Sequence, residues 1–364
     1  MNKIKAFLAR KGVVCSFRQY GVDALGAMAQ GLFCTLLVGT ILNTLGQQLH
    51  IGFLTAPVVS VGTVSYTVGG LASAMVGPGI AVAIGTALHC PPLVLFSLIP
   101  VGFAANAMGG AGGPLAVYAV TIIAAELGKL VSKETRIDIL VTPCVTVIAG
   151  IAVAQLIAAP IGTAARAVGL AIMWATELQP FFMGVLVSAL IGIALTLPIS
   201  SAAICAAFGL TGLAGGAAVA GCCAQMVGFA VMSFKENRWG GLVAQGVGTS
   251  MLQMPNILKN PRIWIPPTLA SMITGPLATC VFKLQMNGSP VSSGMGTCGF
   301  VGQIGVYTGW VSDVAAGTKA AITPMDWIGL VLICFILPAV LSTFFCRVLE
   351  KQGWIREGDM KLDL

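Results

Sequence analysis

The chain has 364 residues, of which 57% are hydrophobic and only 9% are charged, and its mean hydropathy is +0.95. Soluble domains carry roughly 25% charged residues, so this composition excludes a soluble protein and indicates an integral membrane protein. The net charge of +7 comes from Lys and Arg at the termini and in short loops. This is the positive-inside pattern, and we expect no nucleic-acid partner.

The N-terminal segment 1–18 contains five basic residues and several apolar ones that share one helical face: Lys3, Lys5, Arg10, Lys11 and Arg18 are the basic set. Two interpretations stay open for this segment. It is either an amphipathic helix on the cytoplasmic leaflet or a basic tail without such a role.

The apolar segments that follow predict an all-α polytopic membrane protein, because the length suffices for about ten spans of about 20 residues. The segment 51–67 is shorter and contains Pro57, which predicts a broken span. The segment 160–177 is less hydrophobic and contains Arg166 and Trp174, which predicts an amphipathic linker in the membrane interface. The longer predicted spans are 24–45, 69–88, 91–107, 115–130, 139–159, 181–197, 213–234, 264–282, 303–318 and 325–346.

Two uncharged interruptions share one pattern. Pro198-Ile199-Ser200-Ser201 is followed by Cys205, and Pro290-Val291-Ser292-Ser293 is followed by Cys298. Eight of the 16 residues in 287–302 are Gly or Ser, which disfavours a continuous helix. Paired helix breaks indicate a transporter binding site, so we predict re-entrant hairpins at 198–212 and 287–302. The alternative is chance recurrence of small residues in a chain with 46 Gly.

The candidate solute-binding residues are polar, uncharged side chains in or near these hairpins. Gln225 has two open interpretations, since it either lines the solute path or bonds a neighbouring helix. The absence of carboxylates predicts a neutral polyhydroxylated solute recognised by hydrogen bonds. The set is Ser200, Ser201, Gln225, Asn287, Ser289, Ser292, Ser293, Thr297 and Gln303.

Sequence motifs for enzymatic chemistry are weak. Gly294, Gly296 and Gly299 match GxGxxG but lack the surrounding βαβ unit, and no Walker A motif occurs. The 11 Cys form no CxxC motif and there are only two His, so we expect neither a metal site nor another cofactor. We also expect that the chain does not itself catalyse phosphoryl transfer, because no phosphoacceptor or nucleotide site is evident.

The pattern as a whole resembles the membrane-embedded IIC components of bacterial sugar phosphotransferase systems, and within them the branch that includes the perfringolysin O regulator. The resemblance rests on the basic N-terminus, the linker near 163–177, the two hairpins and the run from Gly294 to Gly302. It implies an EIIC-like transporter fold, a homodimer, and a transport domain that carries the hairpins. Unlike many IIC members, this chain has no Glu beside Pro198, which leaves its coupling to phosphorylation open. We expect the tail after Arg347 to be too short for a fused phosphoacceptor domain, so any phosphoryl-carrying partners are expected to be separate cytosolic chains.

These observations give a domain plan and a location. We expect both termini to lie on the cytoplasmic side of a bacterial inner membrane. The predicted function is translocation of a small neutral polar solute, with a sugar as the expected class; the alternative is a IIC-like sensor that binds a ligand without transport. The plan is an amphipathic helix at 1–18, a scaffold and dimerisation region at 19–162, the linker at 163–178, a transport region at 179–347 and a solvated tail at 348–364.

Overall fold

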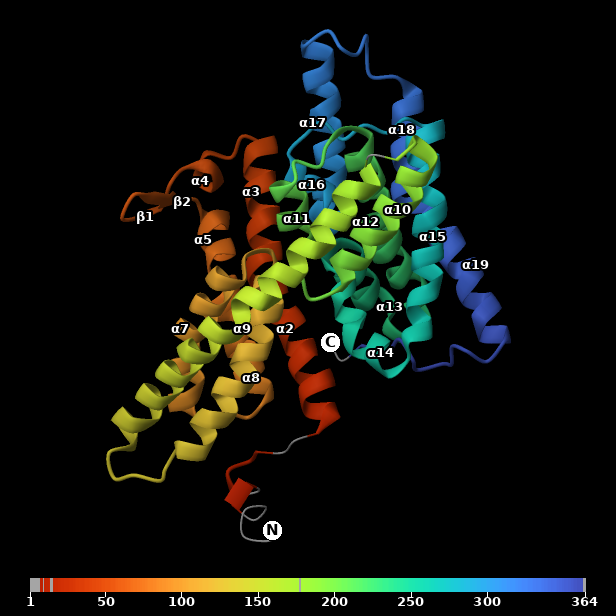
Figure 1. The fold of residues 1–364 in the computed structure, drawn as a ribbon. Helices are drawn as coiled ribbons and strands as arrows, with labels where there is room; N and C mark the ends of the chain where they lie inside the picture. Colours follow the sequence, from red (N-terminus) through yellow and green to blue (C-terminus); the bar gives the residue numbers. More distant parts are fainter. Residues whose placement is uncertain (1–6, 9, 14–15, 177, 363–364) are drawn as a thin grey trace. The chain divides into compact units, whose positions relative to one another are not determined.

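A computed structural model describes residues 7–8, 10–13, 16–176 and 178–362. The described chain is mostly helical (Figure 1), and it divides into two compact units, Met1–Ala164 and Ala165–Leu364. The division falls within α9 (Asp138–Thr176), and residues 163–176 of the predicted linker form about the last third of this helix. Much of the predicted helix at 1–18 lies outside the described residues, and its interpretation stays open.

Unit 1 consists of apolar helices joined by short turns. Its elements up to α9 are η1 (Arg18–Asp23), α2 (Ala24–Leu32), η2 (Phe33–Leu37), α3 (Val38–Gln48), α4 (Gly52–Thr55), β1 (Val59–Val61), β2 (Val64–Tyr66), α5 (Val68–Ala74), α6 (Val76–Ala87), α7 (Pro92–Gly109), η3 (Gly110–Gly112) and α8 (Gly113–Val131). The helices α6, α7 and α8 pack against one another, and α2 packs on α6.

Small residues permit these close helix contacts, as is typical of membrane bundles. A side chain at Gly31 of α2 would lie 2.7 Å from the backbone of Ile80 in α6. The chain reverses between α7 and α8 at Gly110, whose φ of +53° favours glycine. The two helices then pack side by side, so the reversal at Gly110 sets their pairing.

The segment predicted as a broken span at 51–67 is different in the structure. After the short helix α4 it forms an exposed β-hairpin, in which Val59 pairs with Tyr66 and Val61 with Val64. The reason is local: β-branched residues alternate with Ser here, which favours strands. Gly62, with φ +61°, then supplies the turn.

A charged cluster lies at the end of α8 and in the loop that follows. Lys129, whose side chain is 2% exposed, pairs with Glu126 at 2.8 Å. Arg10 lies 2.9 Å from Glu134, and Lys11 contacts the same carboxylate oxygen. The cluster therefore ties the described part of the N-terminal segment to the α8–α9 loop.

Unit 2 holds the rest of the chain. After the end of α9 come α10 (Pro180–Thr196), α11 (Ser201–Ala207), α12 (Gly212–Met232), α13 (Phe234–Val243), η4 (Ala244–Gly248), η5 (Ser250–Gln253), α14 (Met254–Lys259), η6 (Pro261–Trp264), α15 (Ile265–Pro276), η7 (Leu277–Val281), α16 (Pro290–Ser293), η8 (Cys298–Phe300), α17 (Val301–Ala315), α18 (Pro324–Val331), η9 (Leu332–Ile336) and α19 (Leu337–Lys351). The helix α12 packs against α10, α15 and α19.

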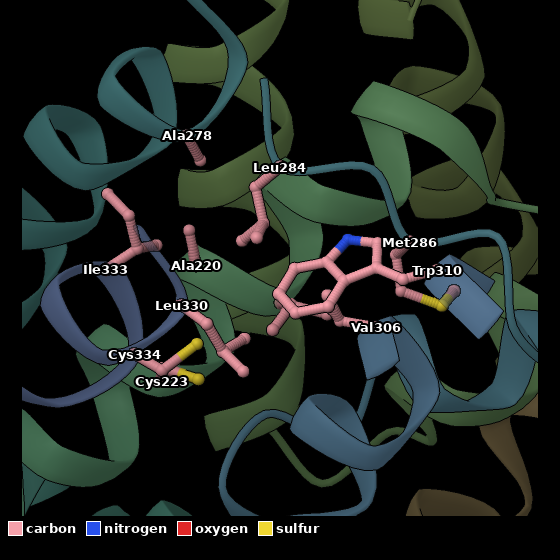
Figure 2. Packing of buried hydrophobic residues seen from close by; sticks show 11 residues of the cluster. Ala220, Cys223, Ala278, Leu284, Met286, Val306, Trp310, Leu330, Ile333 and Cys334 are labelled. Carbon is pink, nitrogen blue, oxygen red and sulfur yellow. The ribbon is translucent and has the colours of Figure 1, made fainter. Parts of the chain in front are cut away.

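The core of unit 2 forms around α12 (Figure 2). Val219, Ala220 and Cys223 of α12 meet Trp310 of α17 and Ile333 of η9 in one buried cluster. The glycines of α12 bring backbones together, because a side chain at Gly221 would overlap the carbonyl group of Ser188 in α10. The helix is therefore held on several sides by apolar contacts.

Membrane-spanning segments are identified by length and composition. Among the described residues, five helical stretches are long and apolar enough to span, and the bent pair α5–α6 raises the number to six. The predicted number of about ten spans and the re-entrant geometry of the hairpins are therefore not confirmed. One stretch, Pro92–Val131, contains both α7 and α8, which the sequence had predicted as two spans, whereas α10 has only 17 residues.

The C-terminal tail departs from the prediction of a solvated segment. Beyond α19 it folds back, and Ile355 and Met360 are each only 2% exposed. The guanidinium group of Arg262 lies 5.1 Å from the centre of the Trp354 ring. The mixed charge of the tail predicted a solvated segment, but its apolar residues Ile355 and Met360 are buried in unit 2. Residues 363–364 lie outside the described part.

Candidate functional site

The first of the two predicted hairpins is a chain reversal between α10 and α12. Ser200 caps the short helix α11, since its hydroxyl accepts a hydrogen bond from the Ala203 N–H at 3.1 Å. The chain then turns through Gly209 and Gly212, with φ of +60° and +63°. Pro198 and these glycines explain why the apolar helix stops here and a new one begins at Gly212.

The second predicted hairpin is built from α16 and the turn that follows. Ser289 precedes α16, and Pro290 occupies its first position, where a missing N–H costs little. Gly296 and Gly299 have φ of +52° and +51°. A side chain at Gly296 would come within 2.6 Å of Cys222 Cβ in α12, so this turn is pressed against that helix.

The two reversals contact each other through reciprocal hydroxyl–carbonyl hydrogen bonds. Ser201 donates to the Gly294 carbonyl at 2.7 Å, and Ser293 donates to the Leu210 carbonyl at 2.6 Å. Gly212 and Met286 also exchange two backbone hydrogen bonds, each 3.0 Å long. The predicted Ser pairs therefore lie together, with Ser201 and Ser293 bonding the opposite segment.

The remaining predicted residues separate into buried and exposed groups. Thr297 is fully buried, and its hydroxyl lies 3.5 Å from Met226 Sδ; Ser292 is 7% exposed. Gln303 donates to Cys223 Sγ at 3.2 Å, and its Oε1 is buried without a hydrogen-bond partner. By contrast, Asn287 and Ser289 are exposed.

Gln225 is fully buried in α12 and bonds neighbouring helices. Its Oε1 accepts from the indole N–H of Trp264 at 3.0 Å and from the Thr196 hydroxyl at 3.3 Å. Its Nε2 donates to the Thr268 hydroxyl at 3.2 Å. Of the two interpretations left open by the sequence, bonding between helices describes these contacts, and a role in the solute path stays a prediction.

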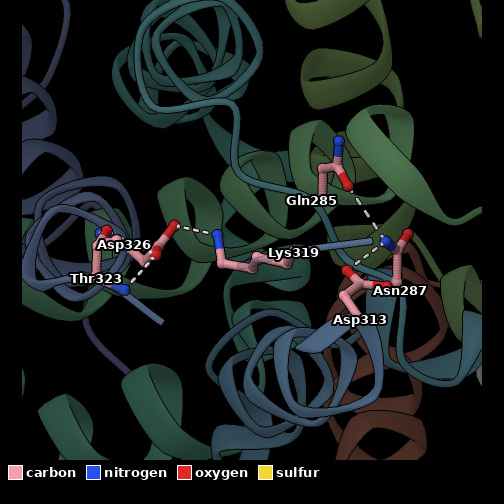
Figure 3. A network of polar contacts seen from close by, with 6 residues as sticks. All are labelled: Gln285, Asn287, Asp313, Lys319, Thr323 and Asp326. Carbon is pink, nitrogen blue, oxygen red and sulfur yellow. Dashed lines mark hydrogen bonds and ion pairs between the residues drawn. The ribbon is translucent and has the colours of Figure 1, made fainter. Parts of the chain in front are cut away.

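An open cavity of about 410 Å³ lies beside the second reversal and includes Asn287. The Asn287 side chain donates to Asp313 Oδ2 at 2.8 Å and to Gln285 Oε1 at 3.2 Å (Figure 3). The complete lining is Phe282, Lys283, Gln285, Asn287, Trp310, Asp313, Thr318, Lys319 and Asp326.

The charges of this cavity balance. Lys319 pairs with Asp326 at 2.8 Å, and Asp326 also accepts from the Thr323 N–H and hydroxyl (Figure 3). Lys283 and Asp313 contribute one further charge of each sign. The cavity thus offers several donors and acceptors without net charge, a lining that suits a neutral polar molecule.

The sequence had placed only Asn287 of the cavity residues in the candidate site. The signal that the sequence offers is Asp313, an acid within the otherwise apolar segment 303–318. Lys319 and Asp326 belong to a loop and the following helix, and no spacing rule connects them to Asn287. Within the described residues, no group of three or more His, Cys, Asp or Glu is arranged to hold a metal ion.

Comparison with known proteins gives one match. Residues 22–362 match the family model described as "Phosphotransferase system, EIIC". No curated protein and no solved structure is significantly similar to the chain. The family match covers nearly the whole sequence and agrees with the resemblance drawn from the hairpins, so the chain belongs to the EIIC family of phosphotransferase-system membrane components.

Proposed function

We propose that this EIIC-family membrane component binds and translocates a small neutral polar solute of the sugar class. The observation that carries the proposal is the charge-balanced cavity beside the second reversal, where Asn287, Gln285 and Asp313 present amide and carboxylate groups. A sugar hydroxyl both donates and accepts, so it replaces either partner in such a network.

The proposed site extends from the cavity toward the two reversals. Asn287 belongs to both regions, because its Oδ1 also accepts a hydrogen bond from the Gly212 N–H at 3.2 Å. The hydroxyls of Ser201 and Ser293 are occupied by main-chain carbonyls. In this proposal they contact solute only when the two reversals separate, and Asn287 makes the first contact.

The setting of the proposed transporter follows from the sequence. Basic termini support a cytoplasmic position for both ends in a bacterial inner membrane. The family supports a homodimer and separate cytosolic phosphoryl carriers. The two reversals support a re-entrant arrangement, because each consists of a short helix between polar breaks.

The test is a thermal-unfolding screen of the purified full-length protein with neutral sugars, polyols, phosphorylated sugars and amino acids. Binding to the folded state raises its stability in proportion to the logarithm of ligand concentration. We expect stabilisation by at least one neutral sugar, and loss of that stabilisation in Asn287→Ala and Gln285→Ala. Gln47→Ala, an exposed site in unit 1, is the matched control.

The outcomes separate the classes of function. Uptake of the same sugar into proteoliposomes supports translocation, whereas binding without uptake supports a receptor. Stabilisation only by charged solutes, or by sugars with equal effect on the Asn287 variant, contradicts the proposed site.

A further inference from the structure

The docked C-terminal tail covers a group of buried amides in unit 2. Gln253 donates to the Met360 carbonyl at 2.9 Å, and Asn256 donates to the Lys361 carbonyl at 2.8 Å. Gln253 is fully buried and Asn256 is 6% exposed. The tail therefore supplies acceptors to side chains that are otherwise enclosed by the protein.

These amides are the first members of a longer series of buried polar groups. Gln253 donates to Gln245 Oε1 at 2.9 Å, and Gln245 donates to the Ser233 hydroxyl at 2.8 Å. All three are fully buried. Ser250 lies in the same short helix, η5, as Gln253, and it belongs to a second group of buried polar side chains.

The series continues toward the centre of α12. The hydroxyls of Ser250 and Thr196 are 2.8 Å apart, and Thr196 donates to Gln225 Oε1. Each of these side chains is fully buried. Two groups of uncharged, buried polar side chains, joined through η5, thus extend from the tail to α12, which begins at the end of the first reversal and packs against α16 of the second. In membrane proteins buried neutral polar groups bond helices to one another, and buried polar groups also line substrate or ion paths.

The tail is held mainly through its main chain. Glu236 of α13 accepts hydrogen bonds from the N–H groups of Gly358 and Met360, each 3.0 Å long. Asn237 donates to the Met360 carbonyl and accepts from the Leu362 N–H, each at 2.8 Å. Such contacts recognise the turn of the backbone, which Gly358 makes possible with φ +97°.

Several features favour release of the tail as an intact segment. Its side chains at Arg356 and Glu357 are already exposed in the docked state, so release does not require these charges to leave a buried site. Burial raises the pKa of Glu236, with further contributions from Asp359 and Glu357, against the two N–H bonds that lower it. The acidic residues of the tail therefore oppose its own attachment to Glu236.

We propose that residues 353–362 form a displaceable plug, bound in a peptide site made by Glu236, Asn237, Gln253 and Asn256, that closes one end of the buried polar series. Release of the plug opens these amides to water on the side of the C-terminus. In Figure 1 this end of unit 2 lies opposite the loop between α17 and α18, which contributes to the cavity. This inference rests on the proposed function, because it takes the buried polar series as the path of the translocated solute.

The test follows amide hydrogen exchange in the full-length protein, in a chain that stops after Gln352, and in Glu236→Gln. We expect exchange in residues 244–262 to be roughly tenfold faster in both variants. Glu357→Gln removes one negative charge from the tail and no hydrogen bond to unit 2; because Glu357 opposes attachment to Glu236, this variant is expected to exchange no faster than the native chain. Unchanged exchange of α10 reports that unit 2 stays folded.

A peptide of residues 353–364 added to the shortened chain is expected to restore slow exchange, whereas the same peptide with Gly358→Pro is not. Native-like exchange in the shortened chain overturns the plug. So does fast exchange throughout unit 2, because the tail is then part of the fold itself, and so does failure of the peptide to bind. None of these readouts needs a solute, so the plug can fail while the proposed transport function stands.

Discussion

Unit 1 buries a charged pair, whereas the buried polar side chains in the described part of unit 2 are neutral. Lys129 in unit 1 is enclosed with Glu126 and also donates to the Gly12 carbonyl at 3.0 Å. Gln225 and Gln253 in unit 2 are equally buried but uncharged. A buried ion pair is costly to break because each charge loses its hydration, while a buried amide exchanges one hydrogen-bond partner for another at small cost.

The difference suits two roles. Lys129 lies in the last turn of α8, where the helix dipole favours a positive charge, and its contacts fix the N-terminal segment. The neutral series of unit 2 can bind water or a polar solute without an uncompensated charge. The charged cluster therefore anchors the N-terminal segment, whereas the proposed passage of solute concerns the neutral amides, and four measurements can break or sharpen this comparison.

The largest expected effect is loss of the buried ion pair. Glu126→Gln leaves Lys129 charged and without its counter-ion, so we expect a loss of roughly 3–5 kcal/mol in the free energy of unfolding. Titration with a denaturing detergent measures it. The double variant Glu126→Leu with Lys129→Leu is the control and is expected to recover most of the loss. A single variant as stable as the native chain would show that the pair does not anchor unit 1.

Removal of the Gln225 amide is expected to cost less. Gln225→Leu leaves the Trp264 indole N–H without its acceptor, which costs about 1–3 kcal/mol, measured in the same titration. Gln303→Leu is the comparison, because its Oε1 already lacks a partner, and we expect a smaller loss. Equal losses would contradict the hydrogen-bond geometry assigned to the two amides.

The hydroxyls between the two reversals come next. Ser201→Ala and Ser293→Ala each remove one hydrogen bond to a main-chain carbonyl and should cost about 1 kcal/mol each. Ser289→Ala changes an exposed side chain near the same segment and is expected to be neutral. If both buried variants also unfold like the native chain, these hydroxyls do not hold the reversals together.

The smallest effect concerns pH at the exposed end of the charged cluster. The hydrogen bond from Lys11, with the charges of Lys11 and Arg10, lowers the pKa of Glu134. A carboxyl whose pKa is lower in the folded state stabilises the protein above its unfolded pKa, ordinarily about 4.3, and this contribution is lost as pH falls through the folded value. Thermal unfolding measured from neutral pH down to about pH 3 should therefore show a weaker acid dependence in Glu134→Gln.

The sequence predicted the positions of the two chain reversals because Pro, Gly and Ser act locally. Pro198 and Pro290 lie next to helix breaks in the structure, and the apolar helices around them were recognisable from composition. The partners of individual side chains were not predictable, since Ser201 meets a carbonyl 93 residues away. The cavity and the docked tail likewise depend on distant contacts, as between Met360 and Glu236.

The length of α9 has a consequence for the surrounding lipid. A straight helix of its 39 residues would rise about 58 Å at 1.5 Å per residue, nearly twice the hydrocarbon thickness of about 30 Å. To stay entirely within the acyl chains it would need a tilt of roughly 60°, beyond the usual range of membrane helices. One end of α9 therefore leaves the acyl chains, and the half with Arg166 and Trp174 is suited to the headgroup region. The length of the lipid acyl chains therefore determines at which residue α9 leaves the hydrocarbon region of the membrane.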